Sequence, residues 1–364
     1  MKEKYEACIL LHALGDTIGY KNGQWEFNNA QDMTSQQWAY VNEMLYEFIE
    51  LGGINNINLD GWKYSDDTIL HSMIASSVKE KFNDDPIKIS DYFAYILKEN
   101  GLHDLQGRHA GRITKHAIRI LMEGKDWKTL PYREMAGGSG ASMRTPVLGL
   151  IYSGKKNRKK LIQIALETSR VTHNNTIGYL GGITSALFTA FAIENIPVNT
   201  WAKKLIEILE SGIIEEYLEQ TRGIKEYIKD KDIFINKWKK YIDEKFTEND
   251  QVIYNKSMRN LVYRTKYYYD NYGYHKSPEY FPGSGGDDSV IIAYDCLIDA
   301  GKSWDKLVVY SMIHVGDSDT TGAIAGALYG ALYGLSNVPS KNLKYLEDKK
   351  KILKIVDHVY NIKK

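Results

Sequence analysis

Residues 316–334 read GDSDTTGAIAGALYGALYG, an acidic motif followed at once by a long apolar segment. Glycine recurs at every fourth position from Gly322 to Gly334, a spacing that places these residues on one face of a helix. A stripe of small residues lets a neighbouring helix approach closely. The stretch therefore predicts a helix deep in the core that begins beside two carboxylates, Asp317 and Asp319.

The rest of the chain shows the same helical spacing. In 69–78 and 307–315 apolar side chains recur three or four positions apart, and alternating strand patterns are scarce. We therefore predict an all-α fold of roughly a dozen helices. No internal repeat or Pro-rich linker divides the chain. We expect a compact multi-helix single domain over residues 1–364, in which 203–280, rich in Lys, Glu and Tyr, forms a peripheral helical excursion.

The overall charge excludes several classes of partner. Lys plus Arg number 47 and Asp plus Glu 46, which gives a formal net charge of +1. Nothing in this balance attracts nucleic acid or an anionic membrane. The most apolar stretches, 178–193 and 323–335, fall short of the roughly 20 residues that a membrane span needs. We interpret both as buried helices and expect no nucleic-acid or membrane partner.

The cysteines and the N-terminal residues bear on the compartment. Cys8 and Cys296 are too few and too far apart for a disulfide framework or a zinc site. Residues 1–6 alternate in charge and show no apolar signal core. We expect a cytoplasmic protein with two buried thiols.

A second acidic motif, YSDDT at 64–68, opens the apolar run that ends at Val78. Ser65 is a natural N-cap, and aspartates suit the first turn of a helix, so each motif taken alone is explained by a well-capped helix. Together the two motifs carry four carboxylates into the core. These would repel one another and resist desolvation unless a cation compensated them.

The ligand types in these motifs favour a hard cation. Carboxylate and hydroxyl oxygens, with no His or Cys at ligand spacing, match magnesium or manganese rather than zinc or copper. Each motif could supply half of a two-metal site. The candidate metal ligands are Ser65, Asp66, Asp67, Asp317, Asp319 and Thr320.

Two glycine-rich stretches, GGSGA at 137–141 and GSGGDD at 283–288, precede helical patterns. Backbone N–H groups in such a loop can bind a phosphate. A flexible connection is the alternative interpretation of each loop. Beside a metal centre, the pair suggests a substrate that carries a diphosphate.

In their order and spacing these motifs resemble the ADP-ribosylglycohydrolase family, most closely the ADP-ribosylarginine hydrolases. Nearly the whole chain takes part, and the NGQWEF motif is similar to the arginine-specific branch. The matching motifs are ALGDTIGY at 13–20, NGQWEF at 22–27, YSDDT at 64–68, GGSGASMR at 137–144, RVTH at 170–173, GYLG at 178–181 and GDSDTTGAIAG at 316–326.

The resemblance implies a compact all-α fold and two magnesium ions, with manganese as the alternative, on the six candidate ligands. It also implies a mobile flap that carries Glu26 over the scissile bond. A helix cap or a core hydrogen bond is the other interpretation of His173. The substrate residues implied are Gly138, Ser139, Gly140, Ala141, Thr145, Thr172, His173, Asn174, Ser284, Gly285 and Gly286.

The chain departs from the family in the second glycine-rich loop. Asp287 stands where the family usually has His, and Ser289 and Val290 replace a pattern that usually contains Pro. The resemblance in this loop therefore rests on Gly283, Ser284, Gly285, Gly286 and Asp288.

The resemblance implies that the chain is an enzyme, a magnesium-dependent ADP-ribosylarginine hydrolase. It would cleave the N-glycosidic bond between ADP-ribose and arginine in mono-ADP-ribosylated proteins and release ADP-ribose. Because cleavage builds positive charge at the anomeric carbon, we expect Asp66 or Asp67 to take a proton from the attacking water, with Glu26 as the reserve base.

Two other functions stay open at this stage. One is a hydrolase of serine-linked ADP-ribose or O-acetyl-ADP-ribose. The other is a module that binds ADP-ribose without catalysis. The four retained aspartates argue against this second alternative.

Overall fold

The computed structural model describes residues 1–29, 35–273 and 280–363. In that part of the chain 17 α-helices and ten short 3-10 helices occur, and the only β-type pairing is two isolated bridges. The all-α prediction is confirmed. The helices outnumber the predicted dozen because several are too short to show an apolar period. The α-helices are α1 (Lys2–Tyr20), α2 (Ser35–Glu50), α3 (Gly53–Asn56), α4 (Asp66–Ser77), α5 (Pro86–Asp104), α6 (Arg112–Met122), α7 (Pro146–Ile151), α8 (Arg158–Arg170), α9 (Thr176–Ile193), α10 (Trp201–Leu209), α11 (Ile213–Gln220), α12 (Ile224–Lys245), α13 (Leu261–Tyr272), α14 (Ser289–Ala300), α15 (Trp304–Met312), α16 (Ser318–Tyr333) and α17 (Lys349–Lys363).

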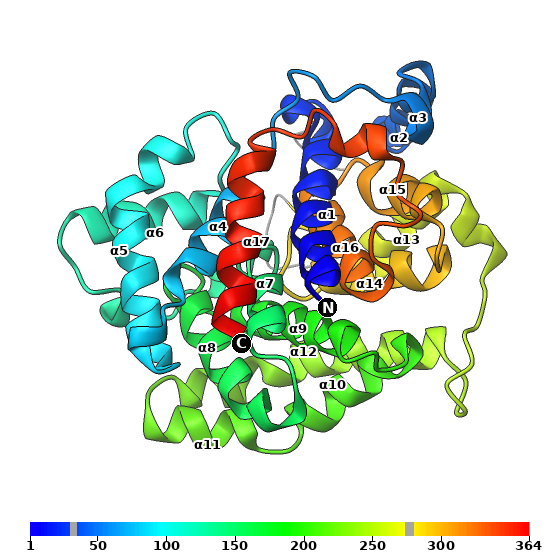
Figure 1. Ribbon diagram of the computed structural model, residues 1–364. Helices are drawn as coiled ribbons and strands as arrows, with labels where there is room; N and C mark the ends of the chain where they lie inside the picture. Colours follow the sequence, from blue (N-terminus) through cyan, green and yellow to red (C-terminus); the bar gives the residue numbers. More distant parts are fainter. Residues whose placement is uncertain (30–34, 274–279, 364) are drawn as a thin grey trace.

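Two helices from distant parts of the chain, α1 and α16, lie side by side at the centre of the molecule (Figure 1). The glycine stripe of α16 faces α1. A Cβ added at Gly326 would lie 2.0 Å from the carbonyl oxygen of Leu11, and one at Gly330 would lie 2.4 Å from that of Ala7. The backbones therefore touch without intervening side chains, as the spacing of the glycines predicts.

Helix α1 contributes glycines of its own to this contact. A Cβ at Gly15 would lie 2.1 Å from the carbonyl oxygen of Gly322, and one at Gly19 would lie 2.2 Å from that of Ser318. The Ser318 hydroxyl also donates a hydrogen bond of 2.9 Å to the Gly19 carbonyl. This contact fixes where the acidic start of α16 lies along α1.

Gly334 does not share this packing role, contrary to the sequence prediction. Helix α16 ends at Tyr333, and Gly334 caps it with a left-handed φ of 74°. No atom lies within 4 Å of a Cβ added there. This fourth glycine terminates the helix, because its conformation is one that other residues adopt at a cost.

Helix α9 explains one of the apolar stretches in the sequence. By length and composition it could cross a membrane, but 94% of its apolar window is buried inside the protein. It packs against α7, α8 and α16. The stretch is a core helix, as predicted.

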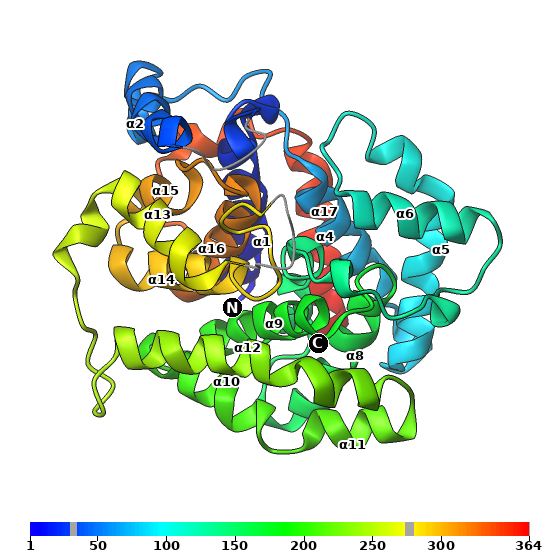
Figure 2. The same ribbon diagram turned by 180° about the vertical axis from the view of Figure 1, so that it is seen from behind.

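The predicted excursion at 203–280 also contributes to the common core, although its residues 274–279 lie outside the described part. Figure 2 shows α12 lying across α9 and α10. Phe234 and Trp238 of α12 are fully buried, and the Trp238 ring meets the Phe188 ring of α9 edge-on at 5.3 Å. Lys245 and Arg264 form buried ion pairs with Asp295 of α14. The segment is therefore packed and ion-paired onto the helices around α16.

We predict that Gly326→Ala destabilises the protein. Alanine favours an exposed helix over glycine by about 1 kcal/mol. Here its methyl group would overlap backbone that cannot turn away, so we expect a net loss of about 3 kcal/mol, read from denaturant unfolding. Gly111→Ala is the control, because no atom lies within 4 Å of its added Cβ. It should cost less than about 1 kcal/mol. Equal effects of the two substitutions would contradict the backbone contact.

Candidate active site

The two acidic motifs lie at the starts of α4 and α16. The Ser65 hydroxyl accepts a hydrogen bond of 3.2 Å from the backbone N–H of Asp67, so the predicted N-cap is present. Asp317 is the N-cap residue of α16 and Asp319 lies in its first turn. All four aspartates are buried.

Both motifs open into one cavity of about 580 Å³, a size typical of small-molecule sites. Carboxylates form one side of it, and the glycine-rich loops and the first turn of α6 form the others. The cavity is lined by Glu26, Phe27, Asp66, Asp67, His109, Gly111, Arg112, Ile113, Thr114, His116, Arg133, Met135, Gly138, Ser139, Gly140, Met143, His173, Ser284, Asp317, Asp319 and Thr320.

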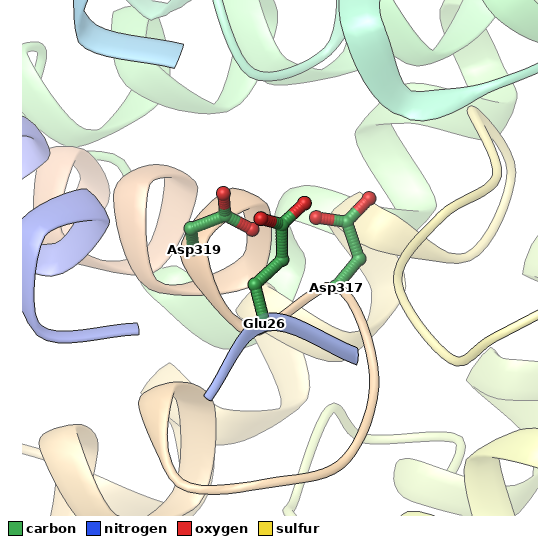
Figure 3. A group of neighbouring side chains, drawn as sticks. All are labelled: Glu26, Asp317 and Asp319. Atoms are coloured by element: carbon green, nitrogen blue, oxygen red, sulfur yellow. The ribbon is translucent and has the colours of Figure 1, made fainter. Parts of the chain in front are cut away.

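Glu26 joins the aspartates from a short 3-10 helix, Glu26–Asn29. One carboxylate oxygen from each of Glu26, Asp317 and Asp319 lies within 4.8 Å of the others. Figure 3 shows the Glu26 carboxylate projecting between the two aspartates. The resemblance implies a mobile flap that carries Glu26, and in the structure its carboxylate lies within the acidic cluster. Residues 30–34, which follow, lie outside the described part.

The crowding of these acids favours their protonated forms. Burial, followed by the charge of Asp319, raises the pKa of Asp16 to about 7. Burial raises the pKa of Asp317 to about 6, although hydrogen bonds from its neighbours oppose the shift. Burial and then the charge of a nearby aspartate raise the pKa of the other carboxyl groups well above their ordinary values, namely Asp66, Asp67, Asp319 and Glu26.

The cluster fits a divalent cation. The Asp67 Oδ2 atom is buried and has no hydrogen-bond partner, which is a costly state for a carboxylate oxygen. The charge of Lys115 lowers the pKa of Asp66, but burial and two aspartates outweigh it. Hard oxygen donors around an uncompensated negative charge match magnesium, calcium or manganese.

The predicted metal ligands differ in their positions. Five line the cavity, but Ser65 does not. Its side chain is fully buried beneath the floor, where its hydrogen bonds lower the pKa of Asp16 and of Asp319. Ser65 therefore supports the acids from below in this structure. The five that line the cavity are Asp66, Asp67, Asp317, Asp319 and Thr320.

Asp16 is a structural residue of the site for which the sequence indicates no role. Its Oδ1 accepts a hydrogen bond of 2.8 Å from the N–H of Ser65. Its Oδ2 accepts bonds of 2.9 Å from the N–H and 2.5 Å from the hydroxyl of Thr68. Asp16 thus ties the start of α4 to α1. Its place in the ALGDTIGY motif was the only signal.

The two glycine-rich loops are joined to each other. Ser139 donates its N–H to the Ser284 carbonyl at 2.9 Å, and Gly286 donates its N–H to the Gly137 carbonyl at 2.8 Å. The Ser139 hydroxyl also donates to Asp317 Oδ2 at 3.0 Å. The loops and the acidic cluster therefore form one wall.

His173 lies beside the first loop. Its Nδ1 shares a hydrogen bond of 2.7 Å with the Thr172 hydroxyl. A Cβ at Gly140 would lie 2.5 Å from the His173 ring, so glycine is required for this approach. Burial lowers the pKa of His173 to about 3, and the ring is therefore neutral. Of the predicted substrate residues, Gly138, Ser139, Gly140, His173 and Ser284 line the cavity.

The other predicted substrate residues lie outside the cavity wall. Thr145 is fully buried and donates its hydroxyl to the Gly182 carbonyl at 2.7 Å. The Asn174 amide donates to the Leu130 carbonyl at 2.8 Å, and Thr172 contacts the His173 ring. These side chains support the wall in this structure. Ala141, Gly285 and Gly286 do not line the cavity either.

The two adjacent aspartates of the second glycine-rich loop have different partners. Asp288 accepts backbone N–H bonds from Gly283 and Gly285, at 2.6 and 2.9 Å, and so shapes the loop. Asp287 is fully buried and pairs with Lys237 of α12. The sequence did not indicate Lys237, because 50 positions separate it from Asp287.

The cavity also has a basic rim that the sequence did not indicate. Arg112 and His116 of α6 lie on it together with Arg133. All three are exposed. Acids at the floor and two arginines at the mouth suit a ligand with an anionic part and a part that reacts beside the acids.

Comparisons with known proteins find matches that extend over nearly the whole chain. The family model described as ADP-ribosylglycohydrolase matches residues 1–364. A protein of Acanthamoeba polyphaga mimivirus, provisionally named ADP-ribosyl glycohydrolase L444, is 44% identical over 325 residues; the match covers 87% of this chain and 61% of that protein. The ADP-ribosylhydrolase ARH1 of Dictyostelium discoideum is 34% identical, with 99% of this chain and 94% of that protein covered.

A solved structure supports the fold alone. The chain titled ADP-ribosylglycohydrolase-related protein complex has a TM-score of 0.57 and 17% sequence identity. The match covers 100% of this chain and 99% of that chain.

We predict that the protein without a divalent cation loses stability as the pH rises. The folded pKa of Asp317 and of Asp16, about 6 and about 7, exceed the ordinary 3.8. The contribution of the two protonated carboxyl groups to stability is fully present below the ordinary pKa. It is lost as the pH rises through the pKa values of the folded state. In a chelator the thermal midpoint should therefore decrease as the pH rises from about 4 to about 7.

Magnesium or manganese should oppose this fall, because a cation binds the ionised carboxylates. Asp317→Asn should flatten the fall in chelator, whereas Asp60→Asn, at an exposed position, should not. A midpoint in chelator that rises over the same interval would contradict the acidic cluster.

Proposed function

The chain belongs to the ADP-ribosylglycohydrolase family, and on that basis we propose that it hydrolyses the N-glycosidic bond between ADP-ribose and arginine side chains of mono-ADP-ribosylated proteins. ADP-ribose would be released and the modification reversed. One observation carries the proposal: the acidic starts of α4 and α16 meet in a single cavity that is also lined by two glycine-rich loops. The loops suit a diphosphate, and the acids suit the reacting end of the substrate.

The charge of the leaving group supports the arginine linkage. A guanidinium group is a cation, and the floor of the cavity adds Glu26 to four aspartates. Such a floor attracts a cation more strongly than the neutral oxygen of a serine linkage. The 34% identity to the Dictyostelium ADP-ribosylhydrolase ARH1 supports hydrolysis of a bond to ADP-ribose.

Asp66 and Asp67 are the proposed proton acceptors. Water would attack the anomeric carbon, a C–O bond would form as the C–N bond breaks, and the carboxylate would receive the proton of the water. The bonding electrons leave with the guanidine, a strong base, which takes up that proton. Asp67 suits the role because its Oδ2 has no hydrogen-bond partner.

The remaining acids would stabilise positive charge on the ribose ring as the bond breaks. We propose two magnesium ions, with manganese as the alternative, held by Asp66, Asp67, Asp317, Asp319 and Thr320. Divalent cations there would supply charge compensation and Lewis acidity.

We predict that Asp67→Asn lowers kcat for release of ADP-ribose from ADP-ribosylarginine by about 100-fold or more, since the general base is lost. Asp66→Asn should have a comparable effect. Circular dichroism should show the helical fold intact, and Asp60→Asn should keep full activity. Near wild-type turnover by both site variants would refute the assignment.

We predict a preference for the arginine linkage. With magnesium present, kcat/KM for an ADP-ribosylarginine peptide should exceed that for an ADP-ribosylserine peptide and for O-acetyl-ADP-ribose by at least about tenfold, or roughly 1.4 kcal/mol. A reversed order would establish the second candidate activity. Binding of ADP-ribose in calorimetry with no turnover of any substrate would instead indicate a binding module.

A further inference from the structure

A histidine at the mouth of the cavity contacts the acid that reaches the cluster from the 3-10 helix. His109 Nδ1 and Glu26 Oε2 share a hydrogen bond of 2.8 Å. The Glu26 side chain is 6% exposed and that of His109 is 48% exposed, so the ring covers the carboxyl group on its solvent side. Among the described residues, no other hydrogen bond holds the Glu26 carboxyl group.

The His109 ring is itself held on two sides. The Tyr20 ring, at the end of α1, meets it edge-on with centroids 5.1 Å apart. On another side lies Gly23, where an added Cβ would come within 2.5 Å of the ring and where φ is +82°. Glycine is thus required at 23 both for its φ and for the close approach of the ring.

The backbone at His109 is anchored to the acidic motif of α4. His109 adopts a left-handed φ of 57°, which is uncommon for a residue other than glycine. The preceding residue, Arg108, accepts the N–H of Asp66 on its carbonyl at 3.0 Å. Its guanidinium donates to the Tyr64 carbonyl at 2.7 Å and to both oxygens of Glu347 at 2.7 and 3.0 Å.

An attractive contact is needed to keep the Glu26 carboxyl group in this position. Burial and the charges of Asp319 and Asp317 disfavour its ionised form in its present place. An unrestrained side chain would rotate toward solvent to escape these charges. The hydrogen bond from a clamped ring, on a backbone tied to the Asp66 motif, opposes that rotation.

We infer that His109 is a positioning residue that holds the Glu26 carboxylate over Asp317 and Asp319. His109 acts through Glu26. The hydrogen bonds of Arg108 fix the distance of His109 from the acids. The effect on turnover rests on the proposed function, whereas the effect on the position of Glu26 does not.

The structural test compares His109→Phe with His116→Phe. Phenylalanine keeps a ring against Tyr20 but cannot bond Glu26. His116 lines the same cavity and makes no hydrogen bond to Glu26, so it is the matched control. In magnesium-free protein, amide hydrogen exchange across residues 24–29 should quicken about tenfold in His109→Phe and stay unchanged in His116→Phe. Equal exchange in wild type and His109→Phe would overturn the inference.

A double-mutant cycle tests the route of the effect. His109→Phe and Glu26→Gln should each lower kcat/KM for ADP-ribosylarginine, and His109→Phe should add little in the Glu26→Gln background. Additive losses would overturn the role through Glu26. His109→Gly, which tolerates the left-handed φ and has no side chain to bond Glu26, gives the same exchange test if the phenylalanine variant misfolds.

The two proposals fail in different ways. Wild-type protein that turns over no ADP-ribosylarginine would refute the proposed function, and the exchange experiment would still decide the role of His109.

Discussion

The backbone contact between α1 and α16 is the constraint on which the cavity floor depends. Glycines on both helices remove the side chains that would keep the two axes apart, and the Ser318 hydroxyl bonded to Gly19 fixes their register. That register brings Asp16 of α1 close enough to Asp319 for each charge to act on the other. Asp16 then holds the start of α4 through Ser65 and Thr68. The packing of α1 against α16 in the core thus sets the positions of the acids at the site.

This geometry concentrates negative charge where water cannot screen it. Burial is the largest cause of the raised pKa at every acid of the cluster, and mutual repulsion adds to it. A fold that assembled the same acids at its surface would feel little of either effect. The acids need a compensating cation because the helices that carry them begin in the buried interior. Cations bound at this floor would complete a site that the chain's own charges leave uncompensated.

The sequence was sufficient for whatever depends on local pattern or on general electrostatics. Helical spacing predicted the fold class, and the apolar helices that follow the two acidic motifs predicted that both motifs would lie in the core. The directions of individual side chains could not be predicted from the sequence. Thr145 and Asn174 directly follow two matching motifs, yet their side chains turn into the wall and donate to the carbonyls of Gly182 and Leu130. Lys237 and Asp287 pair across 50 positions, a distance no local pattern reports.

The order of the helices along the chain has a consequence for biosynthesis. Gly19 and Ser318, which touch in the folded protein, are separated by 299 positions. A ribosome makes α1 long before α16, so the first helix must wait with its glycine face uncovered. The nascent chain holds Asp66 and Asp67 without their partners for most of translation. The acids therefore assemble only late, when the helix that carries the second pair emerges and docks.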